Sequence, residues 1–484
     1  MSFDLREYQI EFYEKIREAI KSGSNKILGQ APTGSGKTVV IAKMLGTAAS
    51  RGYRAWFLVH RRELIKQSVQ TLTDSAGIPL GIVAAGFPGN RREPIQVCSV
   101  QTLTKRRHLL DDPQLIIVDE AHHTPAASWG SLISMYPNAV IIGLTATPER
   151  LDGTGLNKYF DKLVTGPSVS WLIQNKYLSD YRMFAPNVPD LSEVHTLGGD
   201  YNKKELSAVL TGSAVVGDAL GHYKKHAAGK RAVCFMWSVE SSIEMAKRFV
   251  EAGIPAVHID GTTREDERDS AIDKFRSGEI KVLSNVEIVS EGFDLPAIEA
   301  AFLLRPTQSL ALYLQQVGRA LRPFEGKSEA LIFDHAGNCR RHGLPDDERE
   351  WSLEGRNKKK KASDECPIKQ CPQCYAVLPA PAGVCKWCGF KFQKIGRGID
   401  EVSGELKEMD LEAERAKRKA ELRAAVTEED LLALGTRRGY TNPDKWAMHI
   451  LGYRRKYEQE SRERDRQAVE KLKQNVAARP KDWI

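Results

Sequence analysis

The stretch Ala31-Pro32-Thr33-Gly34-Ser35-Gly36-Lys37-Thr38 joins an apolar β-rich run, Lys26–Gln30, to a helical stretch. Glycines in such a loop let backbone N–H groups turn inward around phosphate oxygens, and the following helix adds its positive end. The Lys37 ammonium can reach the β- and γ-phosphates of a nucleotide, and the Thr38 hydroxyl can ligate Mg²⁺. The strand–loop–helix order therefore predicts a phosphate-binding loop rather than a glycine-rich turn that carries Lys-Thr by chance.

A second apolar run, Leu115–Val118, ends in two carboxylates, Asp119 and Glu120. Because the carboxyl ends of parallel strands open onto the ligand crevice of such sheets, we expect both side chains near the phosphate loop. Asp119 is suited to hold Mg²⁺, and Glu120 to orient and deprotonate the attacking water. Together the two stretches predict a site that hydrolyses ATP with Mg²⁺.

Short β-rich runs alternate with helical stretches twice along the chain, which favours an α/β fold of two parallel-sheet units. We predict a first ATP-binding domain at 1–175, a second domain at 176–345, a charged linker at 346–365, a cysteine-rich segment at 366–393 and a helical tail at 394–484. Residues 180–230 contain Pro186, Pro189 and Gly198-Gly199 and are expected to be loop and linker.

Composition excludes several classes of protein. The 484 residues are 41% hydrophobic, which supports packed cores and excludes wholesale disorder. No run approaches the roughly 18–20 apolar residues of a membrane helix, and the N-terminus lacks the apolar core of a secretory signal. We therefore expect a cytoplasmic protein. The formal net charge of +8 is a mild bias toward polyanions.

Downstream of the phosphate loop, Asp119-Glu120-Ala121-His122 resembles the second motif of the DEAD/DEAH-box superfamily 2 helicases. In that family the loop motif often begins with Ala, as Ala31 does here. Thr145-Ala146-Thr147-Pro148 looks like the third motif, and the resemblance implies that His122, Thr145 and Thr147 couple nucleotide state to nucleic-acid grip. Leu5-Arg6-x-Tyr8-Gln9 is similar to the adenine-reading element, which implies that Arg6 and Gln9 contact ATP.

The second α/β unit carries motifs of the same family. Gln315-Gln316-Val317-Gly318-Arg319-Ala320-Leu321-Arg322 resembles the sixth motif and implies catalytic roles for Gln315, Arg319 and Arg322. Arg319 and Arg322 lie three apart, so they share a helix face and can clamp a γ-phosphate as charge develops. Ser290–Pro296 is similar to the fifth motif, with Gly292 and Asp294 as implied ATP contacts. The resemblance implies two tandem RecA-like domains with an ATP cleft between them.

Further stretches resemble the bacterial and phage helicases near the restriction-enzyme translocase subunits. These are Thr145–Gly155, with its Gly153-x-Gly155 pair, Glu291–Pro296 and Arg305–Ser309. The family binds one strand mostly through phosphates, which position the strand without reading its sequence. By motif, the implied nucleic-acid contacts are Arg62, Gln101, Thr102, Ser238, Gly261 and Thr262. Purely structural roles are the alternatives to nucleic-acid contact: Thr102 could cap a helix, and Trp237, beside Ser238, could belong to the core.

Four cysteines form two C-x-x-C pairs, Cys371–Cys374 and Cys385–Cys388, ten residues apart. Four thiolates at this spacing suit tetrahedral Zn²⁺, and the segment resembles a zinc ribbon that the metal would hold folded. The alternative is a redox dithiol, and Cys366 is a fifth thiol that could replace Cys371. The sequence leaves open whether the ribbon contacts DNA, docks a protein or clamps a domain.

The motifs together predict an ATP-dependent DNA helicase or translocase of bacterial or phage type that serves replication or repair. One rival is an RNA-dependent ATPase of the same family. The RNA 2′-OH is the group that would discriminate the two, and no residue here indicates a contact to it. The other is an ATP-switched clamp that does not unwind, with the ribbon and tail as its working parts. A protein partner on the ribbon or on the tail is a further hypothesis.

Overall fold

The computed structural model describes residues 5–59, 63–123, 127–150, 153–185, 191, 194–197, 200–211, 218–286, 298–355 and 368–392, and in the tail 420–422, 424–437, 444, 447–448 and 450–451. The chain divides into two compact units, Met1–Gln393 with the last four residues, and Lys394–Pro480. None of the described helices is long and apolar enough to cross a membrane.

The first lobe is built on a parallel sheet of seven strands. Their order is β3 (Gly81–Val83), β4 (Ile95–Ser99), β2 (Ala55–Val59), β5 (Leu115–Val118), β6 (Val140–Thr145), β1 (Lys26–Gln30) and β7 (Lys162–Thr165). Alternate residues of one strand enter two separate cores: Phe57 packs with one cluster, and Trp56 and Leu58 with the other. The sheet is therefore buried on both faces, which is why its strands read as continuous apolar runs.

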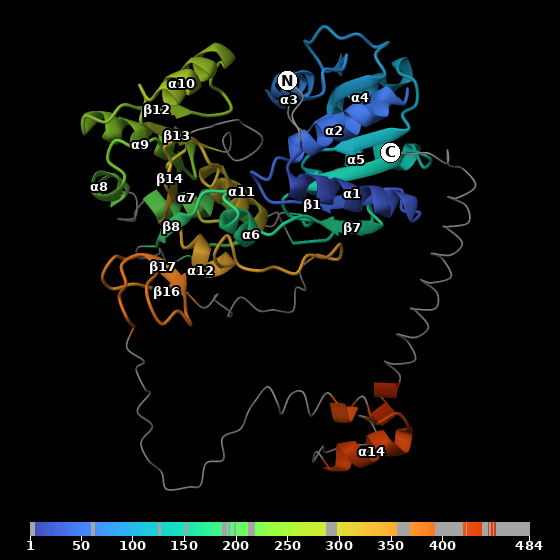
Figure 1. Ribbon diagram of the computed structural model, residues 1–484. Coiled ribbons are helices and arrows are strands. Elements are labelled where there is room, and N and C mark those ends of the chain that lie inside the picture. Colours follow the sequence, from blue (N-terminus) through green and yellow to red (C-terminus); the bar gives the residue numbers. More distant parts are fainter. Residues whose placement is uncertain are drawn as a thin grey trace. The chain divides into compact units, whose positions relative to one another are not determined.

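Helices of the first lobe carry or flank the predicted motifs (Figure 1). They are α1 (Glu7–Lys21), α2 (Lys37–Ser50), α3 (Glu63–Ala76), α4 (Val100–Arg106) and α5 (Ala127–Met135), with short 3₁₀ turns at Arg107–Leu109 and Ala121–His123. Helix α2 starts where the phosphate loop ends, and the 3₁₀ turn at Ala121 follows the two carboxylates.

The second lobe holds a parallel sheet of six strands. Their order is β12 (Ala256–Ile259), β13 (Val282–Asn285), β11 (Ala232–Phe235), β14 (Ala300–Leu303), β15 (Ala330–Asp334) and β8 (Tyr181–Phe184). Its described helices are α6 (Val169–Gln174), α7 (Lys203–Thr211), α8 (Asp218–His226), α9 (Val239–Glu251), α10 (Glu265–Ser277), α11 (Leu310–Ala320) and α12 (Asn338–His342). A small hairpin joins β9 (Thr196–Leu197) to β10 (Asp200–Tyr201). The α/β fold of two parallel-sheet units is thus confirmed.

The prediction that residues 180–230 are loop and linker is wrong. Strand β8 pairs in parallel with β15, and α7 and α8 follow it. The run Tyr181–Phe184 is only four residues long and contains an arginine, so it lacks the apolar signature of a central strand. It forms a strand because its partner, almost 150 residues later, completes the edge of the sheet.

The cysteine-rich segment contains an antiparallel pair, β16 (Ile368–Gln370) and β17 (Val377–Pro379). An isolated bridge joins Phe184 of β8 to Ala376, so the segment lies along the edge strand of the second sheet. In the tail unit, α14 (Glu428–Arg437) contributes Leu431 and Leu434 to a small core that includes Ala447. Cys366 and most of the predicted helical tail at 394–484 lie outside the described residues.

Candidate active site and metal centre

The phosphate loop connects β1 to α2 and is shaped by two left-handed glycines, Gly34 (φ +86°) and Gly36 (φ +80°). A Cβ at Gly36 would also lie 2.3 Å from Gln9 Nε2, so only glycine fits there. The Lys37 ammonium folds back and donates to two carbonyls of its own loop, Ala31 O at 3.1 Å and Pro32 O at 3.3 Å. A nucleotide phosphate would offer this ammonium charged acceptors in place of those carbonyls.

Gln9 and Tyr8 hold the loop from α1. Gln9 Nε2 and the Tyr8 hydroxyl both donate to Ser35 O, at 3.1 and 2.9 Å. Gln9 Oε1 accepts from Arg6 N at 3.0 Å, which closes the first turn of the helix. The Arg6 guanidinium lies 5.1 Å above the Tyr177 ring. The predicted adenine element is thus placed beside the phosphate loop, with the Gln9 amide engaged by protein groups.

Asp119 and Glu120 leave the end of β5, where Asp119 N donates to Leu58 O at 3.1 Å. Glu120 has a φ of +48°, a left-handed conformation that is strained for a residue with a side chain. Glu120 N donates to Asp119 Oδ1 at 3.0 Å, which fixes one carboxylate over the turn. The packing of the buried strand before Glu120 maintains this strained conformation. Strained backbone conformations of this kind are common at functional sites.

The carboxylates and Lys37 form one half-buried electrostatic group. Burial and the neighbouring Glu120 carboxylate raise the pKa of Asp119 to about 6. Burial alone would raise the pKa of Glu120, but the hydrogen bond from His122 and the Lys37 ammonium lower it to about 2. Burial lowers the pKa of Lys37, and the Glu120 and Asp119 carboxylates act against that shift. Glu120 is therefore ionised at neutral pH. Below about pH 6 Asp119 is protonated, and a metal ion that binds its carboxylate would have to displace that proton.

The three predicted coupling residues meet in one network. His122 Nδ1 lies 3.3 Å from Glu120 Oε2 and 3.1 Å from Thr145 Oγ1. The Thr145 hydroxyl donates to Thr147 O at 2.8 Å, so toward His122 it can only accept a hydrogen. The structure therefore links the second motif to the third through two side chains.

The predicted arginines come from the other lobe, at the end of α11. Gln315 and Arg319 are buried, and Arg319 and Arg322 are near enough to Lys37 to oppose its charge. A Cβ built at Gly318 would lie 2.6 Å from Thr33 Cβ, so this glycine lets α11 touch the phosphate loop. A Cβ at Gly34 would lie 3.6 Å from Arg322 Cγ. The two lobes thus bring the predicted halves of the ATP site together.

A cavity of about 430 Å³ lies next to this contact. Its walls include Thr33 of the loop, Gly318 of α11, the segment Thr165–Val169 and the segment Pro345–Trp351. Lys37, Asp119 and Glu120 are not among its lining residues, so it adjoins the phosphate site without containing it.

The predicted nucleic-acid contacts are dispersed over both lobes. Ser238 caps α9, accepting from Ser241 N at 3.1 Å, and the neighbouring Trp237 is buried. Thr262 donates its hydroxyl to Asp260 Oδ1 at 2.7 Å, whereas nothing lies within 4 Å of a Cβ at Gly261. Gln101 and Thr102 lie in the first turn of α4, whose N-cap is Ser99 and not Thr102. Arg62, Gly292 and Asp294 lie outside the described residues.

Sequence reasoning missed Gln30, the last residue of β1. Its buried amide donates to Ala146 O at 2.9 Å, between Thr145 and Thr147, so it ties the strand before the phosphate loop to the third motif. The available signal was a polar residue at the end of an apolar strand, since a buried amide needs a partner.

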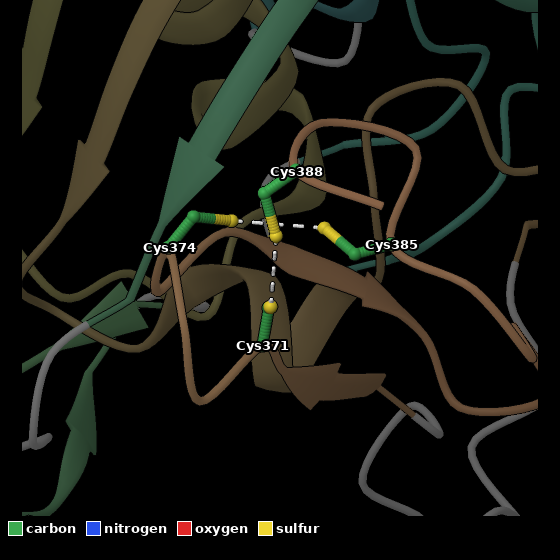
Figure 2. Close-up of side chains that lie close together, drawn as sticks. All are labelled: Cys371, Cys374, Cys385 and Cys388. Atoms are coloured by element: carbon green, nitrogen blue, oxygen red, sulfur yellow. Dashed lines mark hydrogen bonds between the residues drawn. The ribbon is translucent and has the colours of Figure 1, made fainter. Parts of the chain in front are cut away.

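Four cysteine sulfurs converge in the segment after the second lobe (Figure 2). Cys371 Sγ lies 3.6 Å from Cys388 Sγ, Cys374 Sγ lies 3.6 Å from Cys385 Sγ, and all four sulfurs are within 4.8 Å of one another. Tetrahedral Zn–S bonds of about 2.3 Å would set the sulfurs about 3.8 Å apart. Burial acts to raise the pKa of Cys371, but backbone amides of Cys374 and Gln373 lower it to about 7. The donor set therefore fits Zn²⁺.

This ribbon is held against the edge of the second lobe. Gln370 Nε2 donates to Ala185 O at 3.2 Å, and Lys386 Nζ lies 3.7 Å from Asp180 Oδ1. The Arg182 guanidinium lies 5.1 Å from the Trp387 ring centre. These three contacts fall on β8 or its flanks, so the ribbon covers the edge strand of the second sheet.

Comparison with known proteins agrees with this geometry. Residues 2–150 match the family model "Type III restriction enzyme, res subunit", and residues 214–323 match "Helicase conserved C-terminal domain". A 51.5 kDa protein of Lactococcus phage (isolate 7-9) is 40% identical over 365 residues, which are 75% of this chain and 77% of that protein.

Two more distant relatives share the same region. The Saccharomyces cerevisiae protein named "Putative ATP-dependent helicase IRC3" is 30% identical over 357 residues, 69% of this chain and 51% of that protein. A solved fragment described as "a putative HsdR subunit of a type I restriction enzyme from Vibrio vulnificus YJ016" shares the fold, with a TM-score of 0.56 and 21% identity over 70% of this chain and 66% of that fragment. With a restriction-enzyme subunit model and a helicase domain model matched in order, and a 40% identical relative covered over most of its length, the chain belongs to the superfamily 2 helicases, in the branch of the phage and restriction-enzyme helicase subunits.

Proposed function

We propose that this chain is an ATP-dependent DNA helicase or translocase that couples ATP hydrolysis to movement along a strand. The observation that supports this most directly is that Lys37, the two carboxylates, and Arg319 and Arg322 at the end of α11 lie near enough to interact electrostatically. Since the arginines come from a different lobe, hydrolysis and lobe closure depend on each other.

Each residue of this group has a role in the proposed reaction. Lys37 would hold the β- and γ-phosphates, and Thr38 and Asp119 would hold Mg²⁺, which neutralises charge on the phosphates when bound. Glu120, ionised at neutral pH, would take the proton of the attacking water. Gln315 would help to orient that water, and Arg319 and Arg322 would stabilise the charge that develops on the γ-phosphate. Arg6 and Gln9 would hold the adenine end, with Gly292 and Asp294 as further contacts.

The His122–Thr145–Thr147 network would carry the state of the site to the nucleic-acid surface. Glu120 contacts His122, and His122 contacts Thr145, so a change at the γ-phosphate reaches the third motif within two side chains. The strand would lie across Arg62, Gln101, Thr102 and Gly261, held by its phosphates. Because the side chains of Ser238 and Thr262 already form hydrogen bonds within the chain, we assign them weaker contributions to strand binding.

DNA is favoured as the track because the matched family model of the first lobe is that of a restriction enzyme subunit. The test is the ATP hydrolysis rate without nucleic acid and with single-stranded, duplex and forked DNA and RNA, each at two salt concentrations. Stimulation by DNA that weakens with salt supports the proposal. Equal stimulation by RNA would support the RNA-dependent rival, and stimulation without strand displacement or translocation would support the clamp.

We also propose that the four cysteines hold one structural Zn²⁺. The supporting observation is that two C-x-x-C turns bring four sulfurs to tetrahedral spacing in a segment whose core is otherwise a few side chains. Metal analysis of freshly purified protein should give one zinc per chain, and Cys374→Ser together with Cys388→Ser should abolish it. A metal-free wild-type protein with free thiols would refute the site.

A further inference from the structure

The segment 344–355 leaves the second lobe and returns to the first, and we name it the strap (Figure 1). Its first residue, Leu344, is buried in the core of the second lobe, and Trp351 packs against the same core. Leu353 packs instead against a core of the first lobe that contains Leu156 and Phe160. The sequence suggested only a charged linker here, but the strap is a second crossing between the lobes, after the one that precedes β8.

One arginine fixes the strap to the second lobe. Arg349 Nη2 donates to His342 O at 3.1 Å and Leu344 O at 2.7 Å, and its Nη1 donates to Pro345 O at 3.3 Å and Asp347 O at 2.8 Å. Leu344 N also donates to Asp347 Oδ2 at 2.8 Å. Four carbonyls on one guanidinium define a turn whose geometry a lysine could not reproduce.

Backbone pairing fixes the other end to the first lobe. Leu156 N and Asn157 N both donate to Leu353 O, at 2.7 and 3.0 Å, and Thr154 forms an antiparallel bridge with Gly355. A Cβ at Gly155 would lie 2.0 Å from Leu353 O. Gly355 has a φ of +78°, and a Cβ there would lie 2.5 Å from Gly153 O. The Gly153-x-Gly155 pair thus has a physical role, since it lets two backbones approach.

The pairing at Thr154–Asn157, which we name the first-lobe anchor, lies shortly after the third motif. Glu149 and Gly155 form an antiparallel bridge, and Glu149 is two residues beyond Thr147. The strap also walls the cavity that Thr33 and Gly318 line. It therefore touches the surroundings of both halves of the ATP site while it is anchored in both lobes.

We propose that the strap is a mechanical tie that couples lobe movement to the third motif, so that releasing its first-lobe anchor separates ATP hydrolysis from strand movement. The proposal rests on the motor function proposed above. The catalytic groups lie outside the strap, so hydrolysis persists when the anchor is lost. Movement of the second lobe then no longer pulls on the Glu149–Gly155 bridge.

The test uses the full chain with Gly155→Ala and, separately, Gly355→Ala, each of which drives a methyl into backbone. The control is Gly326→Ala, whose φ of +82° is close to the +78° of Gly355 and which has nothing within 4 Å of its Cβ. Hydrogen exchange of a peptide spanning 154–160 reports the anchor through the Leu156 and Asn157 amides. ATP turnover and strand displacement on forked DNA report the coupling.

We expect faster exchange in both strap variants, stimulated ATP turnover within about threefold of wild type, and at least a fivefold rise in ATP consumed per base pair displaced. Faster exchange with unchanged coupling would overturn the proposal, as would lost coupling in a variant whose amides keep wild-type protection. A wild-type chain that shows no movement on any nucleic acid would instead refute the motor function, and the strap proposal with it.

Discussion

The contact between Gly318 and Thr33 makes a quantitative prediction for Gly318→Ala. The added Cβ would lie 2.6 Å from Thr33 Cβ and 2.9 Å from Thr33 Cγ2. Carbon atoms pack at about 3.5–4.0 Å, so α11 or the loop has to withdraw by about 1 Å. A misplacement of about 1 Å in a catalytic arrangement can lower the rate on the order of 100-fold, and Arg319 is the next residue.

The substitution should act on chemistry more than on folding or binding. Alanine is favoured over glycine inside a helix by about 1 kcal/mol, which offsets part of the clash in the free energy of unfolding. Lys37 and the phosphate loop, which we propose hold the β- and γ-phosphates before reaction, lie in the first lobe, so nucleotide affinity should change by less than about threefold. We therefore expect kcat of the DNA-stimulated ATPase to fall about 100-fold with an almost unchanged Tm.

The assay compares steady-state kcat, binding of a fluorescent ATP analogue and thermal unfolding in Gly318→Ala and in Gly221→Ala. Gly221 is an exposed glycine within α8, so the control adds the same methyl to a helix without a neighbour across the cleft. A kcat for Gly318→Ala within threefold of the control would refute the reasoning that this close approach positions the arginines.

Three further substitutions or conditions have defined outcomes. Glu120→Gln should lower ATP turnover at least 100-fold while nucleotide binding persists, and loss of binding as well would contradict its role as the base. Burial and Glu120 raise the pKa of Asp119 to about 6, so kcat/KM should fall as the pH drops through about 6. A tenfold rise in Mg²⁺ should move this acidic limb of the pH profile to lower pH, because the metal competes with the proton. An acidic limb near pH 4 that does not respond to Mg²⁺ would argue against Asp119 as a ligand. Ser238→Ala should cost about 1 kcal/mol of stability through loss of the α9 cap, measured by denaturant unfolding, with DNA stimulation of the ATPase changed by less than twofold; a larger loss of stimulation would restore Ser238 as a strand contact.

The sequence by itself determined the fold class, and it predicted the loop, carboxylates and arginines that the structure brings together. Buried parallel strands need apolar side chains on both faces. Leu115–Val118 and similar runs could therefore be predicted as strands from their own sequence, without knowledge of the strands that pair with them. Phosphate binding needs glycines, a lysine and a hydroxyl within one short loop, and a site for Zn²⁺ of this type needs two close cysteine pairs. These are local requirements, and local spacing records them.

Only the tertiary structure decided the features that depend on distant partners. Strand β8 exists because β15 pairs with it, the role of Gly318 appears only when Thr33 faces it, and the ribbon proves to lie on the edge of the second sheet. The strap looked like a charged linker because its anchors are backbone carbonyls and amides, which every residue carries and no side-chain pattern reveals. Hydrogen bonds between main chains far apart in sequence are set by the packed fold, and they join the two lobes here.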